Sequence, residues 1–342
     1  MKNRKGFRLA LIGTDSMRGK EIKSVLSKKE FPFVSIDFFD TDVKQEYSKL
    51  TEFKGEPKVI HYPDENYLSG IDLVFLSADK KVNKKYGDLA KKKKYFAIDL
   101  SETFNKDRKI PVVVAGVNDW ILQKEKPQII ANPHPVAIIL SHIFNVISTK
   151  YTLLKAVSFV MQPASAYEES GIGELANQSV ASLSSASITK EVFKTQIAFN
   201  LLSHTEPVDK HGFTLVEKQI VSEIKRILND SDFPLALSLV QAPVFHTYSI
   251  MSYLELKEKT DIQTLEDLFK KFPYFKLLAP VRSCPVSSIS VAGKDEIFIG
   301  QIKKDSAFPN NFWIWSVADN LTRGSVLNAF EIAKLLYNAS RT

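Results

Sequence analysis

The chain has 342 residues, which is more than one ordinary domain needs and enough for two domains with separate cores. It is 44% apolar and 25% charged, a composition typical of globular proteins that excludes a disordered or fibrous chain. The one cysteine, Cys284, excludes a disulfide within the chain and a zinc site built from cysteines. No apolar run approaches the roughly 18–20 residues of a membrane span, and the start of the chain lacks the apolar core of a signal peptide. We therefore expect a cytoplasmic protein with no metal site and no membrane contact.

The net charge of +7 comes from one lysine-rich segment, Lys80–Lys94. This segment holds eight lysines against a single acidic residue, Asp88, and the remainder of the chain is electrically neutral. It lacks the interleaved aromatic and arginine side chains that stack on bases, so we interpret it as a solvated helix face. The alternative is a nucleic-acid or membrane-surface binder, whose affinity would fall steeply with salt.

Short apolar runs alternate with helix-length polar stretches over the first 133 residues. The runs that predict strands are Phe7–Ile12, Val34–Phe39, Leu73–Leu76, Tyr95–Ile98, Val112–Val114 and Ile129–Ala131. Strands that are apolar on consecutive positions belong in a parallel sheet covered on both faces. With Met17–Ser27 and Val82–Lys93 as helices between them, the pattern predicts an N-terminal Rossmann-like, doubly wound parallel sheet of the α/β class.

A different pattern follows Pro135. The apolar stretch Val136–Ser148 predicts a buried helix, and Thr214–Leu228 predicts an amphipathic helix in which Thr214 and Glu217 form a capping box. The expected strands are Leu154–Met161, Leu237–Val244, Thr247–Leu256, Ile297–Ile302 and Phe312–Val317, and Ser325–Tyr337 is expected to form the last helix. This order predicts a second, α+β domain with a mixed or antiparallel sheet. The small-residue stretch Ala164–Ser187 is compatible with a binding loop or a dimer contact.

The first predicted strand runs into a glycine turn, Gly13-Thr14-Asp15-Ser16-Met17-Arg18-Gly19. Small residues at such a turn let backbone amides approach a dinucleotide pyrophosphate at a helix N-terminus. Ser16 stands at the middle glycine position, where its hydroxyl would replace part of the phosphate contact, whereas the charge of Asp15 disfavours an anion. Asp37, Asp40 and Asp42 close the second strand and suit a ribose 2′-hydroxyl better than a 2′-phosphate, which favours NAD over NADP. A tight turn without a cofactor stays an open alternative.

Many short sequence blocks follow one another in a recognisable order. They are Gly13–Gly19, Ser77-Ala78, Asp99-Leu100-Ser101 with Phe104, Val112-Val113-Val114 with Val117-Asn118, Asn132-Pro133, Gln162, Phe199-Asn200, the Thr214/Glu217 helix, Pro243-Val244, Asp319-Asn320-Leu321 with Gly324, and Asn328-Ala329. In this order the chain resembles the aspartate-semialdehyde dehydrogenase family over essentially its full length.

The resemblance implies two domains. Residues 1–133, with the C-terminal helix 321–342 packed back onto them, would bind NAD or NADP, and residues 134–320 would serve catalysis and homodimer formation. The cofactor positions that it implies are Gly13, Asp15, Ser16, Met17, Gly19, Asp37, Ser77 and Asn320.

The family's chemistry needs a cysteine nucleophile and a histidine that acts as acid and base. In this chain the nucleophile position is Pro135, which has no nucleophile, and the base position is Tyr248. A phenol with a pKa near 10 is mostly in the wrong protonation state for a base at neutral pH.

The family also holds its substrate and phosphate with cationic side chains. The two arginine positions are Asn105 and Gln241 here, and a lysine position is Gln219; Gln162 and Glu217 remain at substrate-site positions. We therefore expect a chain that is inactive in the family's reaction, similar to the Usg-type branch, which lacks the cysteine. Such a paralogue would bind a dinucleotide, a small metabolite or a protein partner.

A second hypothesis is an NAD(P)-dependent oxidoreductase that acts on an aldehyde without a covalent intermediate. His134 and Tyr248 would then supply its catalytic groups. In the alternative, His134 fills the vacated pocket or bonds a backbone carbonyl and has no catalytic role. His246 is expected on the same strand face as Tyr248, two residues away. Cys284 is expected to be an unreactive thiol.

Overall fold

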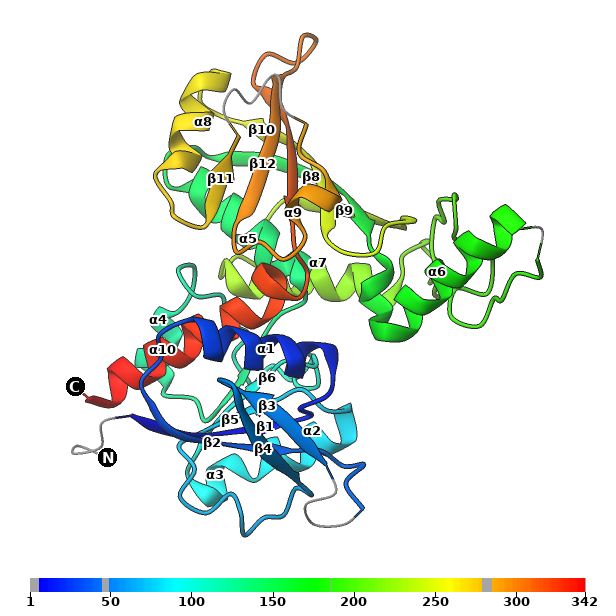
Figure 1. Ribbon diagram of the computed structural model, residues 1–342. Coiled ribbons are helices and arrows are strands. Elements are labelled where there is room, and N and C mark those ends of the chain that lie inside the picture. The colour runs from blue at the N-terminus through cyan, green and yellow to red at the C-terminus, as the bar shows by residue number, and fades with distance from the viewer. Residues whose placement is uncertain (1–5, 45–48, 185, 279–284, 342) are drawn as a thin grey trace. The chain divides into compact units, whose positions relative to one another are not determined.

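The computed structural model describes residues 6–44, 49–184, 186–278 and 285–341, so Cys284 lies outside the described residues. The chain divides into two compact units. The first contains residues 1–134 and 325–342, and the second contains residues 135–324 (Figure 1).

The first unit is built on a seven-stranded sheet with the order β3-β4-β2-β1-β5-β6-β7. The strands are β1 (Phe7–Ile12), β2 (Phe33–Phe39), β3 (Leu50–Phe53), β4 (Glu56–His61), β5 (Leu73–Leu76), β6 (Phe96–Asp99) and β7 (Ile129–Ala131). All neighbours run parallel except β3 and β4. This arrangement confirms the Rossmann-like sheet. The strand order reverses at β1, where ligands of such sheets bind beyond the carboxyl ends of the strands.

Two details of the first sheet differ from the sequence prediction. The β3–β4 hairpin was not predicted, because its strands are short and mostly polar on the solvent side. The segment Val112–Val114 is not a regular strand, since only an isolated bridge joins Val112 to Ala131.

Helices of the first unit are α1 (Met17–Lys28), α2 (Lys80–Asp88), α3 (Ala90–Lys93), α4 (Trp120–Glu125) and α10 (Leu327–Arg341). Helix α10 contacts α1, and its Phe330 and Leu336 share one buried cluster with Leu9 and Leu11 of β1. The single helix expected over Val82–Lys93 is broken at Leu89. Most lysines of the Lys80–Lys94 segment are exposed, as a solvated helix face requires.

The second unit holds a six-stranded mixed sheet with the order β11-β12-β13-β10-β8-β9. Its strands are β8 (Leu153–Gln162), β9 (Leu235–Gln241), β10 (Tyr248–Leu256), β11 (Phe275–Leu277), β12 (Ile297–Lys304) and β13 (Asn311–Ala318). The pairs β8–β9 and β11–β12 are parallel and the other pairs antiparallel, which confirms the expected mixed sheet.

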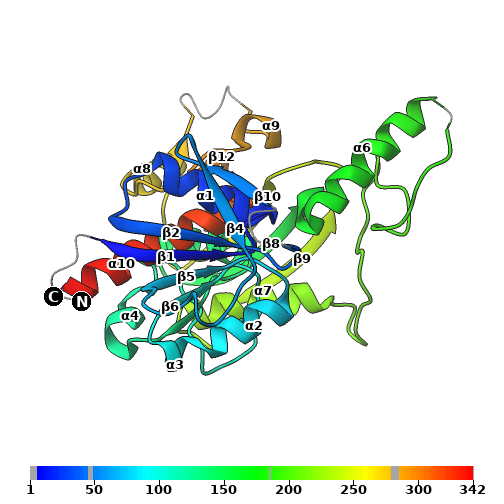
Figure 2. The ribbon, with the colours of Figure 1, turned by 60° about the horizontal axis from the view of Figure 1, so that its bottom comes forward.

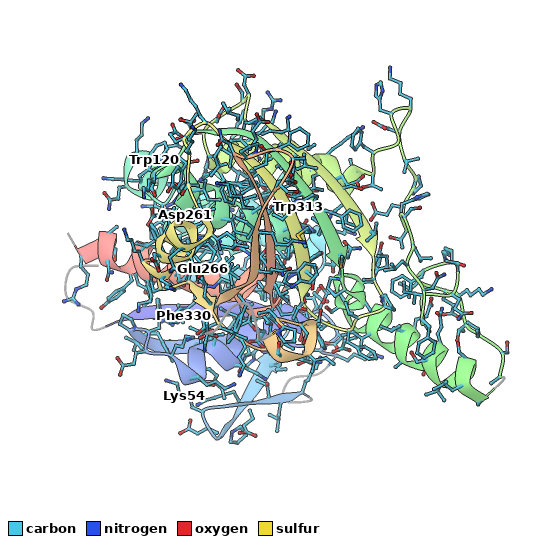
Figure 3. The ribbon with its side chains drawn as sticks, turned by 90° about the horizontal axis from the view of Figure 1, so that it is seen from above. Lys54, Trp120, Asp261, Glu266, Trp313 and Phe330 are labelled. Atoms are coloured by element: carbon cyan, nitrogen blue, oxygen red, sulfur yellow. The ribbon has the colours of Figure 1, made fainter. Side chains whose placement is uncertain are left out.

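Three helices of the second unit are α5 (Pro135–Ser148), α7 (Leu215–Ile227) and α8 (Ile262–Lys270). Helix α5 contacts α7, α8 and β8, α7 contacts β9, and α8 contacts β11 and β12. The opposite face of the sheet is partly open, and a buried cluster of Val286, Val291, Phe298 and Val317 covers the rest. There Val157 and Phe159 of β8 are each 40% exposed, and Trp313 of β13, labelled in Figure 3, is 36% exposed.

The small-residue stretch forms a short 3₁₀ turn, Ala164–Tyr167, and helix α6 (Glu168–Ser184). Helix α6 extends away from the six-stranded sheet (Figure 2). It is held by a small core of its own, in which Leu175 packs with Phe193 and Ile197. The buried carboxylate of Glu174 accepts the backbone N–H groups of residues 191–193 over 2.7, 2.6 and 3.0 Å. These contacts come from residues distant in sequence, so composition alone did not predict them.

Candidate functional site

The outer glycines of the turn are required by close packing within the first unit. Gly13 has a φ of +91°, and a Cβ there would lie 2.3 Å from the backbone nitrogen of Ala78. A Cβ on Gly19 would lie 2.0 Å from the carbonyl oxygen of Gly13. The two glycines therefore let β1, β5 and α1 approach one another, as in dinucleotide-binding turns.

Ser16 is the N-cap of α1, not a strained replacement for a glycine. Its φ of −61° suits any residue, its Oγ accepts from the N–H of Gly19 over 2.9 Å, and it donates to the carbonyl of Gly13 over 2.9 Å. The hydroxyl is thus used inside the turn, and its contact with a phosphate stays a prediction. Met17 is the first residue of the helix.

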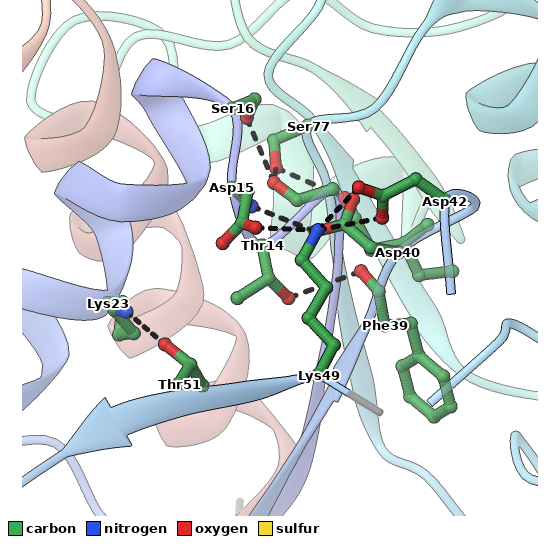
Figure 4. A network of polar contacts seen from close by, with 12 residues as sticks. Thr14, Asp15, Ser16, Lys23, Phe39, Asp40, Asp42, Lys49, Thr51 and Ser77 are labelled. Carbon is green, nitrogen blue, oxygen red and sulfur yellow. Dashed lines mark hydrogen bonds and ion pairs between the residues drawn. The ribbon is translucent and has the colours of Figure 1, made fainter. Parts of the chain in front are cut away.

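A lysine that the sequence analysis missed lies over the glycine turn (Figure 4). The Nζ of Lys49 lies 2.6 Å from the Oδ2 of Asp15, 2.7 Å from that of Asp42 and 3.7 Å from that of Asp40. The carboxylate of Asp40 also accepts the backbone N–H of Asp15 over 3.0 Å. No local signal could identify Lys49, because it is brought to the turn by the unpredicted β3–β4 hairpin.

The carboxylates of this network differ in their environments. Burial raises the pKa of Asp40, whereas the hydrogen bond from Lys49 lowers the pKa of Asp42. Burial works against the charge of Lys49, but hydrogen bonds to Asp15 and Asp42 outweigh it and raise the pKa of the ammonium. Asp37 lies inside β2, opposite Ala10. Asp40 is therefore the carboxylate placed at the turn, and Asp37 is not part of this network.

Polar groups at the ends of β5 and β6 stabilise the same edge of the sheet. The hydroxyl of Ser77 donates to the carbonyl of Gly13 over 2.8 Å, so it braces the turn. The buried carboxylate of Asp99 accepts from the N–H of Ser101 over 2.9 Å and from that of Phe104 over 3.0 Å. Burial raises the pKa of Asp99 despite these bonds.

His134 is buried in the first unit. Burial lowers the pKa of its imidazole, the nearby Glu102 opposes that shift, and Arg18 adds to it. Arg18 and Glu102 lie 4.0 Å apart as a loose ion pair. The side chain of Asn105 donates to the carbonyl of Asn132 over 3.3 Å. At neutral pH this part of the unit therefore holds an uncharged imidazole.

In the second unit, three of the expected site positions form one buried hydrogen-bonded network. The hydroxyl of Tyr248 donates to the Oε1 of Gln162 over 3.4 Å, and the Nε2 of Gln162 donates to the Oε1 of Gln241 over 3.0 Å. The Nε2 of Gln241 donates in turn to the backbone carbonyl of Gln162 over 3.0 Å. All three side chains are at least 95% buried. The network contains no formal charge.

Glu217 has a structural role, as the capping box predicts. Its Oε2 accepts from the backbone N–H of Thr214 over 2.8 Å, and its Oε1 accepts from that of Leu239 in β9 over 2.9 Å. Gln219, two residues further on, donates to Glu223 one turn later over 2.9 Å. Pro135 opens helix α5, a position where its missing N–H costs nothing.

His246 lies elsewhere than expected, whereas the cofactor role of Asn320 stays a prediction. The Oδ1 of Asn320 accepts from the backbone N–H of Thr247 and from the hydroxyl of Ser165, both over 3.1 Å. His246 precedes β10, which begins at Tyr248, and Thr247 has a φ of +74°. The alternation of an extended strand does not apply across such a residue, so His246 and Tyr248 do not share a strand face.

Two further findings concern the described residues only. They contain no group of three or more His, Cys, Asp and Glu side chains placed to hold a metal ion. None of their helices is both long and apolar enough to span a membrane.

The parallel sheet with its glycine turn, joined to a mixed-sheet unit, defines a two-domain protein with a nucleotide-binding type of N-terminal fold. Residues 8–124 match the family model described as semialdehyde dehydrogenase, NAD binding domain. Residues 147–323, more than half of the chain, match the model described as semialdehyde dehydrogenase, dimerisation domain. The chain belongs to the semialdehyde dehydrogenase family.

Relatives cover almost the whole chain. Aspartate-semialdehyde dehydrogenase of Aquifex aeolicus is 28% identical over 97% of this chain and 98% of its own length. That of Bacillus subtilis is 26% identical over 97% and 98%. The crystal structure of aspartate semialdehyde dehydrogenase II from Vibrio cholerae, complexed with ASA, has a TM-score of 0.90 at 26% identity and covers 97% of this chain and 98% of its own.

Proposed function

We propose that this chain is a catalytically silent member of the semialdehyde dehydrogenase family that binds a dinucleotide and forms a homodimer. The Tyr248–Gln162–Gln241 network carries the proposal. At positions where the family resemblance implies a histidine base and an arginine anchor, neutral side chains bond to one another and to the backbone. Such a network offers neither a group that titrates near neutral pH nor a cation for a carboxylate.

The nucleophile position supports the same proposal. Pro135 has no side-chain nucleophile, and its place at the start of α5 suits proline. Glu217 bonds two backbone amides through its two oxygens, which supports a structural role for the remaining acidic group.

Dinucleotide binding is supported by the glycine turn and by the match to an NAD binding domain. The backbone of residues 13–19 at the start of α1 would face the pyrophosphate, and Asp40 would face the adenosine ribose. When bound, the cofactor supplies a hydride acceptor or donor. The carboxylates of Asp40 and Asp42 favour NAD over NADP.

Homodimer formation is supported by the match to a dimerisation domain and by the open face of the six-stranded sheet. Tyr253 and Trp313 lie on neighbouring strands of this face with ring centroids 4.4 Å apart. Exposed aromatic and aliphatic side chains on one face are typical of an interaction surface. We place the protein in the cytoplasm on its composition and its single cysteine.

The test is an assay of the purified chain with aspartate semialdehyde, phosphate and either NAD or NADP, followed by the absorbance of the reduced nicotinamide. The Aquifex aeolicus relative serves as the positive control. We expect no turnover above the enzyme-free rate. Turnover comparable to that of the control would refute the proposal, and turnover lost in His134→Ala would instead favour the non-covalent oxidoreductase.

A further inference from the structure

Asp15 poses an electrostatic problem for the proposed dinucleotide site. It is part of the glycine turn, and its carboxylate is 43% exposed. A dinucleotide pyrophosphate carries negative charge, so an uncompensated carboxylate beside it would weaken binding.

Lys49 compensates this charge. Its ammonium is within 2.7 Å of carboxylate oxygens of both Asp15 and Asp42, and its side chain is 24% exposed. Its backbone is fixed, because its carbonyl oxygen accepts from the N–H of Ile60 in β4 over 2.9 Å. The hairpin therefore places the cation over the turn.

The same lysine ties three segments together. Asp15 comes from the turn after β1, and Asp40 and Asp42 come from the segment after β2. Asp40 adds a direct bond to the backbone N–H of Asp15 over 3.0 Å. With three carboxylates and one ammonium the cluster has a net charge of −2, and without Lys49 it would have −3.

We propose that Lys49 is a positioning residue for dinucleotide binding: it cancels the charge of Asp15, which would lie beside the pyrophosphate, and holds Asp40, which would face the adenosine ribose. This inference rests on the proposed dinucleotide binding. Lys49 would not contact the ligand itself. It would act through Asp15, whose charge it neutralises, and through Asp40, which it orders.

The experiment is calorimetric titration of the full-length purified chain with NADH and with NADPH. Lys49→Met should weaken NADH binding by at least about tenfold, because it leaves Asp15 uncompensated. Lys49→Arg should retain binding, since it keeps the charge. Lys58→Met is the matched control: it removes one cation from the same hairpin, where Lys58 pairs with Glu56 over 2.6 Å.

A double-variant cycle separates charge from folding. The double variant Asp15→Asn/Lys49→Met should bind NADH about as tightly as the native chain, because both clusters have a net charge of −2. Raising the salt concentration should also narrow the gap between Lys49→Met and the native chain.

The outcomes are distinct. If the native chain binds NADH but Lys49→Met binds it equally well, the inference fails and the proposed function stands. A loss in Lys49→Met that Asp15→Asn does not relieve also overturns it. If a thermal melt shows that Lys49→Met is unfolded, Lys49→Arg decides, and a loss of NADH binding in folded Lys49→Arg overturns the inference. If the native chain binds neither NADH nor NADPH, dinucleotide binding itself fails.

Discussion

The Nε2 of Gln162 donates to the Oε1 of Gln241 over 3.0 Å, and the two residues face each other at the same register of the parallel strands β8 and β9. Each residue is the last of its strand. Neither side chain can rotate away without leaving a buried amide unpaired, so the pair fixes an uncharged site at this end of the sheet.

The first prediction concerns this pair. Gln241→Leu should lower the free energy of unfolding by roughly 1–3 kcal/mol, because it leaves buried groups of Gln162 without their partner. Gln162→Leu combined with Gln241→Leu should cost less than the sum of the single variants, since both ends of the bond are removed together. Urea denaturation of the three variants measures this coupling, and strict additivity would contradict it.

The second prediction concerns His142 in α5. Its imidazole is fully buried, and among the described residues neither ring nitrogen has a hydrogen-bond partner. Burial, with a smaller effect of Arg323, lowers the pKa of His142 to about 3.

Because the unfolded state takes up a proton near pH 6.5 and the folded state does not, stability should fall as the pH drops from about 6.5 towards 3. This histidine should account for on the order of 4 kcal/mol of that loss. The pH series of unfolding free energies should be flatter for His142→Phe and unchanged for His211→Gln, an exposed histidine. An equal slope in the native chain and His142→Phe would speak against the assignment.

The third prediction compares two glycines with similar backbone angles. Gly13 has a φ of +91° and Gly55 one of +79°, but only a Cβ at Gly13 would meet backbone atoms, whereas nothing lies within 4 Å of one at Gly55. Gly55→Ala should therefore cost only about 1 kcal/mol, the usual penalty of a positive φ. Gly13→Ala should cost several times more and abolish NADH binding. Thermal melts and titrations of both variants test this, and equal losses would refute the packing argument.

The fourth prediction concerns the open sheet face of the second unit. Phe159→Glu places a charge among Val157, Tyr253 and their neighbours, and should convert a dimer into monomers without unfolding the chain. Leu50→Glu, at a residue 61% exposed in the first unit, is the control and should leave the dimer intact. Sedimentation velocity distinguishes the two results; a Phe159→Glu dimer of native stability would place the interface elsewhere.

Much of the fold follows from short-range sequence patterns. The consecutive apolar residues of Phe7–Ile12 and Leu73–Leu76 predict buried parallel strands, and both strands are present. The capping box of Thr214 and Glu217 lies within one helical turn and forms as expected. The assignment of site residues by resemblance stays a prediction, because no bound ligand tests it.

The break in the helix at Leu89 and the irregular segment at Val112 were not predicted. Both depend on tertiary contacts with the sheet, not on local propensity. Helix α6 was not predicted either. Its sequence is rich in serine and alanine, and the hydrogen bonds that stabilise it join Glu174 to the backbone of residues 191–193.

The sequence by itself determined the two-domain α/β architecture and the glycine turn, and it predicted that Pro135 and Tyr248 stand in place of reactive residues. Only the tertiary structure decided what these residues do, because the contacts that matter join positions far apart in the chain. Lys49 pairs with Asp15 because of a hairpin that local patterns do not predict. Gln162 bonds to Gln241, which is 79 residues away in the chain and lies on the neighbouring strand. Hydrophobic periodicity is a local signal, whereas electrostatic compensation and hydrogen-bond satisfaction are properties of the folded chain.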